Sequence, residues 1–433
     1  MYMTEHYQCV GVGCGPSNLS MAALLHGNKE IKSIFFDAKK EFSWHDGMMM
    51  RNSDLQVSLF KDLVTLADPC NKFSFISYLH QHNRLYQFLN ARFEQMSRQE
   101  FRGYLKWVSE NNENVIFGEK VLNVEFKDDV FHVETSQRSI TSENVVIGVG
   151  TQPNVPEFVS SRLNDSNHFH VNSFASRDDN FVGKHVVVIG GGQSGAEAVL
   201  DLIQRQGTMA PAVVTWISRR ENFFPLDDSS FTNDFYSPAH SNYFFEQEKE
   251  YRDNFLSRNI LSSDGVSEST LRMIYQRIYT LKYVTDEKMV VNLLPYREVY
   301  GVNEINYGWC VAVKHLADNS NAEIPADVVV WASGFKPASL PFLKNIRECI
   351  EQENNEIKID KHYAAIWNGP SNNNIFLLNA ARTQRGLSDP NLSLIAWRSQ
   401  TVINRMIGSS GNSTQNNSSF VSWGQCQKAI GQE

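Results

Sequence analysis

The sequence has few cysteines, no long apolar run and no excess of positive charge. Its six cysteines are scattered and form no C-x-x-C pair, which argues against a redox disulfide, a zinc site and a secreted disulfide framework. No run reaches the roughly 18 apolar residues that a membrane span needs, and the opening MYMTEHYQCV lacks the pattern of a signal peptide. The formal net charge of −8 argues against a nucleic acid or an anionic membrane as partner. We therefore expect a cytoplasmic protein with reduced thiols and no metal site.

The most informative segment is residues 185–200, HVVVIGGGQSGAEAVL. Its β-branched apolar residues predict a buried strand, and a helix is expected from Ala196 onward. Between them, Gly190, Gly192 and Gly195 have the spacing G-x-G-x-x-G, which allows a tight turn, close approach of a pyrophosphate and close packing of the helix on the strand. The helix N-terminus then offers free N–H groups to the phosphates. A glycine turn with a purely structural role is the alternative, but the strand–turn–helix context favours nucleotide binding.

A second copy of this pattern lies near the N-terminus, in YQCVGVGCGPSNLSMAALL. It contains Gly11, Gly13 and Gly15, followed by Pro16 at a helix start, where proline is well tolerated. About 26 residues after Gly11, a second apolar strand ends in Asp37, the residue type and distance expected for an acid that binds an adenosine ribose. Two dinucleotide folds in one chain indicate two dinucleotides, which is the pattern of a flavoprotein reductase or monooxygenase.

The later fold carries two arginines where a ribose-binding acid would otherwise stand. Its second strand, residues 212–217, ends in Ser218, Arg219 and Arg220. Arginines at this point favour the 2′-phosphate of NADPH over the bare ribose of NADH. A solvated basic surface is the alternative interpretation.

At 433 residues the chain suits two or three domains. We expect an α/β fold with two Rossmann-like dinucleotide-binding domains, for FAD and NADPH, and a smaller, mainly helical substrate region. Helices are expected over 75–89, 97–108 and 394–406, whereas 38–69 is expected to be a long functional loop. The expected division is 1–155 and 365–410 for the FAD-binding domain, 183–225 and 287–340 for the NADPH-binding domain, 226–286 for an insertion at the substrate pocket, and 411–433 for a flexible tail.

Several longer segments are more specific than either glycine turn, among them GVGCGPSNLS, FSWHDGM, LQVSLFKDLVTLADP, SRQEFRGYLKW, ISRRENFFPLDDSSFTNDFYSP, WASGF and GLSDPNLSLIAWR. Together they resemble the flavin-dependent N-hydroxylating monooxygenases of siderophore biosynthesis, the lysine and ornithine N-monooxygenase family, which also includes diamine and histamine N-monooxygenases. The resemblance runs from Val10 to about Ile407.

The resemblance implies an NADPH- and O2-dependent hydroxylation of a terminal primary amine. NADPH reduces FAD, O2 adds to give a C4a-hydroperoxyflavin, and the neutral amine attacks the distal oxygen, while the protein positions the partners and excludes water. The substrate is L-lysine or L-ornithine, or a decarboxylated amine such as cadaverine, putrescine or histamine. The family also suggests a homo-oligomer, for which we expect a tetramer.

Three other functions share parts of this pattern. Flavin monooxygenases that act on sulfur or carbonyl substrates also have two dinucleotide folds, but their F-x-G-x-x-x-H-x-x-x-[WY] fingerprint is not seen here. A disulfide reductase would need a cysteine pair. A nucleotide-binding regulator without catalysis would have no reason to keep both glycine turns and the long loops.

By resemblance, the substrate contacts come from three distant segments. Lys61 is expected to pair with the α-carboxylate of an amino acid, Asn233 to orient the amine, and Ser393 to lie in the segment that closes the pocket. Gln56 is expected near both the flavin and the substrate, so the expected catalytic residues are Asn233 and Gln56. Asn391 stands where ornithine enzymes tend to have leucine and makes the pocket floor more polar. The expected cofactor contacts are Gly11, Gly13, Gly15, Pro16, Ser17, Asp37, Trp44, His45 and Gln56 for FAD, and Gly190, Gly192, Gln193, Ser194, Gly195, Arg219, Arg220 and Ser263 for NADPH.

Overall fold

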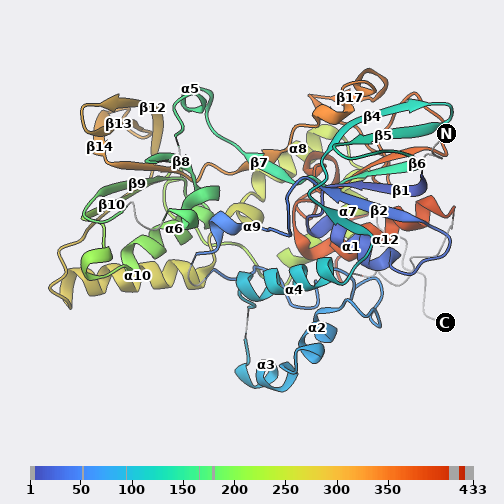
Figure 1. The fold of residues 1–433 in the computed structure, drawn as a ribbon. Helices are drawn as coiled ribbons and strands as arrows, with labels where there is room; N and C mark the ends of the chain where they lie inside the picture. The colour runs from blue at the N-terminus through green and yellow to red at the C-terminus, as the bar shows by residue number, and fades with distance from the viewer. Residues whose placement is uncertain are drawn as a thin grey trace, which may run out of the picture.

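The computed structural model describes residues 5–50, 53–93, 95–164, 166–177, 181–408 and 419–424. It contains two separate sheets of nucleotide-binding type, one at each side of Figure 1, so the predicted α/β fold class with two Rossmann-like folds is confirmed. The chain passes between them twice, at β7 (Thr151–Pro153) and β16 (Phe335–Pro337), which pair antiparallel. The second fold is therefore an insertion within the first.

The first sheet has the strand order β3-β2-β1-β6-β5-β4, and β19 also pairs with β6. Its strands β1, β2, β3, β6 and β19 are parallel, and residues such as Cys9 and Val10 on the central strand are fully buried. Helices α1 and α12 pack against each other and share the apolar core of this sheet. The elements are β1 His6–Val12, α1 Pro16–Leu25, β2 Ser33–Asp37, β3 Val115–Phe117, β4 Val121–Lys127, β5 Val130–Thr135, β6 Ser139–Ile147, β19 Asn374–Leu377 and α12 Ile395–Met406.

The second sheet is entirely parallel, with the order β11-β10-β9-β15-β8. Helices α6 and α10 share a core with one face of this sheet, and a three-stranded antiparallel sheet, β12-β13-β14, packs on the other face. The valine-rich strands fit this arrangement, because a parallel sheet is covered on both sides. The elements are β8 His168–His170, β9 His185–Ile189, α6 Gln193–Gln204, β10 Val213–Ile217, α10 Glu268–Tyr283, β11 Val290–Leu294, β12 Arg297–Ile305, β13 Gly308–His315, β14 Asn321–Ala326 and β15 Val328–Trp331.

The insertion between β10 and β11 is helical, as expected. It has a small core of its own, in which Tyr236, Phe244 and Phe255 pack with Leu387 from the C-terminal part of the chain. The insertion therefore packs against the chain segment that precedes Ser393. Its elements are η5 Thr232–Tyr236, α7 Pro238–Phe245, α8 Lys249–Arg258 and α9 Leu261–Asp264, followed by α10.

A helical arm, α2 (Phe75–Gln81), α3 (Leu85–Ala91) and α4 (Arg98–Glu110), precedes β3. The prediction of one helix over 75–89 is wrong, because Asn83 adopts a left-handed conformation (φ 56°) and the N–H of Arg84 closes back on the carbonyl of Leu79. Ser97 caps α4 by accepting from the N–H of Glu100, as the sequence predicted. The remaining short elements are η1 Asp46–Met48, α5 Glu157–Ser160, η2 Val171–Ser176, η4 Gly207–Met209, η6 Pro341–Leu343, η7 Arg347–Cys349, β17 Gln352–Glu353, β18 Glu356–Ile357, α11 Arg382–Arg385 and η8 Leu392–Leu394.

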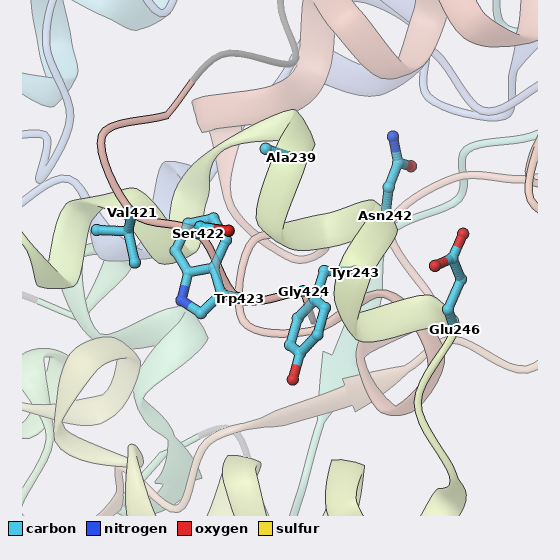
Figure 2. A pocket seen from close by; sticks show the side chains of 8 residues that line it. All are labelled: Ala239, Asn242, Tyr243, Glu246, Val421, Ser422, Trp423 and Gly424. Atoms are coloured by element: carbon cyan, nitrogen blue, oxygen red, sulfur yellow. The ribbon is translucent and has the colours of Figure 1, made fainter. Parts of the chain in front are cut away.

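Residues 419–424 lie against α7, where the Trp423 ring meets the His240 ring edge-on with centroids 4.9 Å apart. A pocket of about 370 Å³ lies there (Figure 2), lined by Ala239, Asn242, Tyr243, Glu246, Val421, Ser422, Trp423 and Gly424. None of the predicted site residues lines it. The rest of the predicted tail, 411–418 and 425–433, lies outside the described residues. Within the described ranges, every helix is too short or too polar to span a bilayer.

Candidate active site

The N-terminal glycine turn has the shape that a bound pyrophosphate requires. Gly13 has φ +87°, and a Cβ there would lie 2.8 Å from the carbonyl oxygen of Gly148, so only glycine fits. A Cβ on Gly11 would lie 2.0 Å from the ring of Phe35 on the neighbouring strand. Gly15 is the N-cap of α1, no side chain caps this end, and Pro16 is in the first turn. The free N–H groups at this helix end fit the FAD phosphates.

Two polar side chains fix this turn from either side. The carboxylate of Asp37 accepts from the N–H of Cys14 through Oδ2 (2.8 Å) and from the N–H of Lys39 through Oδ1 (2.9 Å). On the other side, the buried amide of Asn18 donates to the carbonyls of Val12 and Gly13. Asp37 was predicted from its spacing to bind a ribose, and that contact stays a prediction. Sequence reasoning missed Asn18, which stands in the GPSN stretch in the first turn of the helix.

The second glycine turn repeats the arrangement at the start of α6. Gly190 has φ +136°, and a Cβ there would lie 2.0 Å from the carbonyl oxygen of Ala332. A Cβ on Gly195 would lie 2.2 Å from the carbonyl oxygen of Gly190, which is the close helix–strand packing that the spacing predicted. Gly192 is the N-cap of α6 and again no side chain caps the helix. This turn therefore fits a second pyrophosphate.

The Gln193 side chain is held within the protein, and Ser194 beside it is half-buried in the first turn of α6. Oε1 of Gln193 accepts from the N–H of Ser267 (2.7 Å), and Nε2 donates to Glu197 (2.8 Å). Gln193 thus joins the glycine turn to the start of α10, and its predicted contact with the pyridine nucleotide stays a prediction.

The two adjacent arginines after β10 differ in their surroundings. Arg219 is exposed, whereas the guanidinium of Arg220 donates to the backbone carbonyls of Asp264 (2.8 Å) and Gly191 (3.4 Å). Arg220 thus ties α9 to the glycine turn, and the predicted contact of Arg219 and Arg220 with a 2′-phosphate stays a prediction.

A third arginine reaches the same region from a distant part of the chain. Arg382 on α11 donates to the hydroxyl of Ser263 (2.8 Å) and lies 3.6 Å from the carboxylate of Asp264. Sequence reasoning missed Arg382, because nothing in its local pattern distinguishes it from a surface arginine. It places one more cation beside the predicted nucleotide contact Ser263.

The structure brings together two predicted substrate contacts that are 332 residues apart in the sequence. Nζ of Lys61 donates to the hydroxyl of Ser393 (3.1 Å), and this hydroxyl donates to Oδ1 of Asn391 (2.6 Å). The N–H of Ser393 donates to the same oxygen (2.8 Å), so Asn391 fixes both groups of the serine. Burial lowers the pKa of the half-buried Lys61 ammonium, and no described carboxylate pairs with it. The site thus offers a partly desolvated cation to an anionic group.

The loop that carries Lys61 is held rigidly by its neighbour. The buried carboxylate of Asp62 accepts from the N–H groups of Val64 (2.9 Å) and Thr65 (2.7 Å) through Oδ1. Through Oδ2 it accepts from the hydroxyl of Thr65 and from the N–H of Phe75, the first residue of α2. A carboxylate with this many donors fixes the backbone, so Lys61 is presented from a defined position.

A buried ion pair joins the two nucleotide folds. The guanidinium of Arg98 at the start of α4 donates to both carboxylate oxygens of Glu197 on α6, at 2.8 and 2.7 Å. The two side chains are 13% and 3% exposed. Burial raises the pKa of Glu197, while Arg98 and Gln193 oppose this shift. The pair links the helix behind the Lys61 loop to the helix that begins at the second glycine turn.

The comparisons with known proteins agree with this geometry. The profile of the L-lysine 6-monooxygenase/L-ornithine 5-monooxygenase family matches residues 5–337. The L-lysine N6-monooxygenase of Escherichia coli is 35% identical over 94% of this chain and 96% of its own length. The chain belongs to this N-monooxygenase family.

The putrescine N-hydroxylase of Acinetobacter baumannii is 29% identical over 93% of this chain and 90% of its own length. The ornithine N-hydroxylase of Kutzneria sp. 744, solved with reduced FAD, NADP+ and L-ornithine, superposes with a TM-score of 0.86 at 28% identity, over 93% of this chain and 99% of its own.

Four further residues have predicted roles beside the flavin or the substrate of this N-monooxygenase: Trp44, His45, Gln56 and Asn233. Trp44 is half-buried with its ring edge-on to Phe101, and His45 adopts a left-handed conformation (φ 53°) at the start of η1. Gln56 is half-buried in a loop. Two residues before it, Asp54 forms an isolated antiparallel β-bridge with Ser97, the N-cap of α4. The amide of Asn233, in η5, donates to the carbonyl of Asp228 (2.8 Å), and no hydrogen bond joins it to Lys61 or Ser393 in the described chain. The expected roles of these four residues stay predictions.

Proposed function

We propose that this N-monooxygenase hydroxylates the side-chain amine of L-lysine or L-ornithine, with FAD and NADPH as cofactors. The observation that carries the proposal is the Lys61–Ser393 pair, in which a partly desolvated ammonium has no carboxylate partner in the described chain. An amino-acid substrate supplies that carboxylate, whereas cadaverine, putrescine and histamine would bring a second cation or an uncharged group to it.

The protein's part in the reaction is to hold three molecules and to keep water out. NADPH supplies two electrons and FAD supplies the activated oxygen, so that R–NH2, O2, NADPH and H+ give R–NHOH, NADP+ and H2O. The two glycine turns bind the pyrophosphates, and Lys61 with Ser393 holds the carboxylate end of the substrate. The amine at the other end must lose its proton before it can act as a nucleophile, and a free lysine amine has a pKa near ~10.4.

A substrate panel tests the proposal. L-Lysine, L-ornithine, cadaverine, putrescine and histamine are assayed for hydroxylamine product, because NADPH loss alone also reports uncoupled turnover. We expect kcat/KM for one of the amino acids to exceed that of its own decarboxylated analogue by roughly 10- to 150-fold, the value of one hydrogen bond to a charged group. Equal or higher kcat/KM for cadaverine, putrescine or histamine would contradict the amino-acid proposal while leaving the N-monooxygenase assignment in place.

The choice of NADPH over NADH depends, in this proposal, on Arg219. Replacing Arg219 with alanine is expected to raise the KM for NADPH roughly 5- to 30-fold, because an exposed arginine–phosphate contact is lost, and to leave the KM for NADH unchanged. Steady-state kinetics with both nucleotides measures this. The matched control is Arg220→Ala, which removes hydrogen bonds to two backbone carbonyls and should weaken both nucleotides alike. A loss of NADPH preference in the Arg220 variant alone would reverse the two assignments.

We also propose that the protein is a homo-oligomer, a tetramer by analogy with its family, and that it works in the cytoplasm. The scattered cysteines support the second proposal, and the five described ones are all free thiols.

A further inference from the structure

Helix α7 connects two segments that carry predicted substrate contacts. It directly follows η5, which contains Asn233, and it packs against α11, which begins the segment that leads to Ser393. The hydroxyl of Ser241 donates to the backbone carbonyl of Arg385 (3.1 Å), and the guanidinium of Arg385 donates to Oδ1 of Asn242 (2.9 Å). The position of α7 therefore affects both segments.

Arg385 has little freedom to move independently of α7. Its side chain is fully buried, and its guanidinium carbon lies 4.6 Å from the centre of the Tyr363 ring and 5.1 Å from that of Phe245, the last residue of α7. Six residues further along the chain, the amide oxygen of Asn391 accepts from both the hydroxyl and the N–H of Ser393. A displacement of α7 is therefore transmitted over a short stretch of chain to Ser393.

The opposite side of α7 is covered by residues 419–424, which come from far along the chain. The Trp423 ring meets the His240 ring edge-on at 4.9 Å between centroids and stacks on the Tyr243 ring at 6.4 Å (Figure 2 shows Trp423 beside Tyr243). His240 is buried, and burial lowers the pKa of its imidazole to about 4, so the ring is uncharged at neutral pH and packs as an aromatic one. Phe420, the other aromatic residue of segment 419–424, is fully exposed, so Trp423 is the aromatic anchor of this segment.

We propose that Trp423 is a positioning residue for the substrate pocket, because segment 419–424 holds α7 against Arg385. A helix of eight residues is below the roughly 12–15 residues at which isolated helices become even marginally stable in water, so packing on both sides must fix α7. Removing the Trp423 ring uncovers one of these sides and leaves α7 free to shift, which loosens the segment that carries Ser393. This inference rests on the proposed role of Ser393 at the carboxylate end of the substrate.

Trp423 acts through α7 and not on the reacting molecules. None of the residues predicted to bind the substrate, FAD or NADPH lines the pocket between α7 and segment 419–424. A purely structural role for Trp423 would lower the thermal midpoint of the protein and leave the kinetics of the folded enzyme unchanged. A positioning role changes the KM for the amine and the yield of product per NADPH, so these two quantities separate the two roles.

Trp423→Ala in the full-length, FAD-loaded protein tests the proposal. With the amine that gives the highest kcat/KM in the substrate panel, we expect its KM to rise roughly 2- to 12-fold, the value of one lost ring contact. Hydroxylamine formed per NADPH consumed should fall, because the amine is less well positioned, while the KM for NADPH stays unchanged. The matched control is Phe420→Ala, which removes an exposed ring from the same segment and should leave all three quantities unchanged. Trp423→Phe keeps a ring against α7 and should restore most of the wild-type values.

Hydrogen exchange provides a second measurement, which needs no substrate. The backbone amides of residues 238–245 should exchange faster in Trp423→Ala than in the wild type or in Phe420→Ala. Three results would overturn the proposal: unchanged exchange in Trp423→Ala, faster exchange with an unchanged KM and product yield, and equal losses in Phe420→Ala. A preference for a diamine in the panel would contradict the proposed amino-acid substrate and leave these outcomes as they are, so the two failures are distinguishable.

Discussion

Replacing Lys61 with methionine is expected to raise the KM for an amino-acid substrate roughly 10- to 150-fold while NADPH oxidation continues. The physical reason is the loss of one charge-assisted contact, which is worth about 1.5–3 kcal/mol. Methionine keeps the volume of the side chain, so the loop anchored by Asp62 stays in place. Hydroxylamine formation and NADPH oxidation, measured together, should show product falling and uncoupled turnover remaining.

The control is Lys127→Met, which removes an exposed lysine at the end of β4 and should leave both rates unchanged. A pH profile adds a second readout. Because burial lowers the pKa of Lys61, the wild-type KM should begin to rise at a lower pH than a fully solvated lysine would give, and the variant should lack this rise. If Lys61→Met bound the amino acid as well as the wild type at every pH, Lys61 would have no part in recognition.

The second large effect concerns the ion pair between the folds. Arg98→Met is expected to lower the free energy of unfolding by about 3–5 kcal/mol, because it leaves the buried carboxylate of Glu197 without its partner. The same change removes the link between α4 and the helix that starts at the second glycine turn, so the fraction of NADPH consumed without product should rise. Urea unfolding followed by flavin fluorescence measures the first effect, and peroxide release the second.

A double-substitution cycle separates the pair from its parts. Arg98→Met combined with Glu197→Leu removes both charges and should recover most of the stability, because no buried charge is left unpaired. The coupling of NADPH oxidation to product should not recover, since the connection between the folds is still missing. Equal destabilisation by the single and the double variant would show that Arg98 contributes through packing and that the charge pair is unimportant.

The parts of this site that the sequence predicted are those governed by local rules. At Gly13 and Gly190 the backbone adopts a positive φ beside a neighbouring carbonyl, and only glycine fits both conditions. Glycines at a fixed spacing in the sequence therefore predict these turns. The position of Asp37 beside the first turn follows from the same logic, because the second strand ends there, while its predicted ribose contact stays a prediction. Ser97 caps its helix within three residues. Each of these features depends on a short segment, so it can be recognised in the sequence without knowledge of the tertiary structure.

The parts that the sequence did not predict depend on distant partners. Arg382 meets Ser263 across 119 residues and Arg98 meets Glu197 across 99, and neither side chain differs locally from a solvated arginine. Lys61 and Ser393 were each expected at the substrate pocket only through family resemblance, and their mutual hydrogen bond was not predicted, because nothing within either segment identifies the other. The break between α2 and α3 was missed for another reason, since a single asparagine in a left-handed conformation outweighed a continuous apolar pattern.

The pairing of β7 with β16 has a consequence for how such a chain can be built. Phe335 lies opposite Pro153, so the point where the chain leaves the first fold is next to the point where it returns. The two covalent connections of the inserted residues to the first fold therefore lie side by side, as for a domain inserted into a loop of another domain, while the Arg98–Glu197 ion pair and the packing of Leu387 add contacts away from them. A short linker could join these two strands in place of the intervening 181 residues, but the excision would also remove the partners of Arg98 and Leu387, so a replacement module would have to supply new ones.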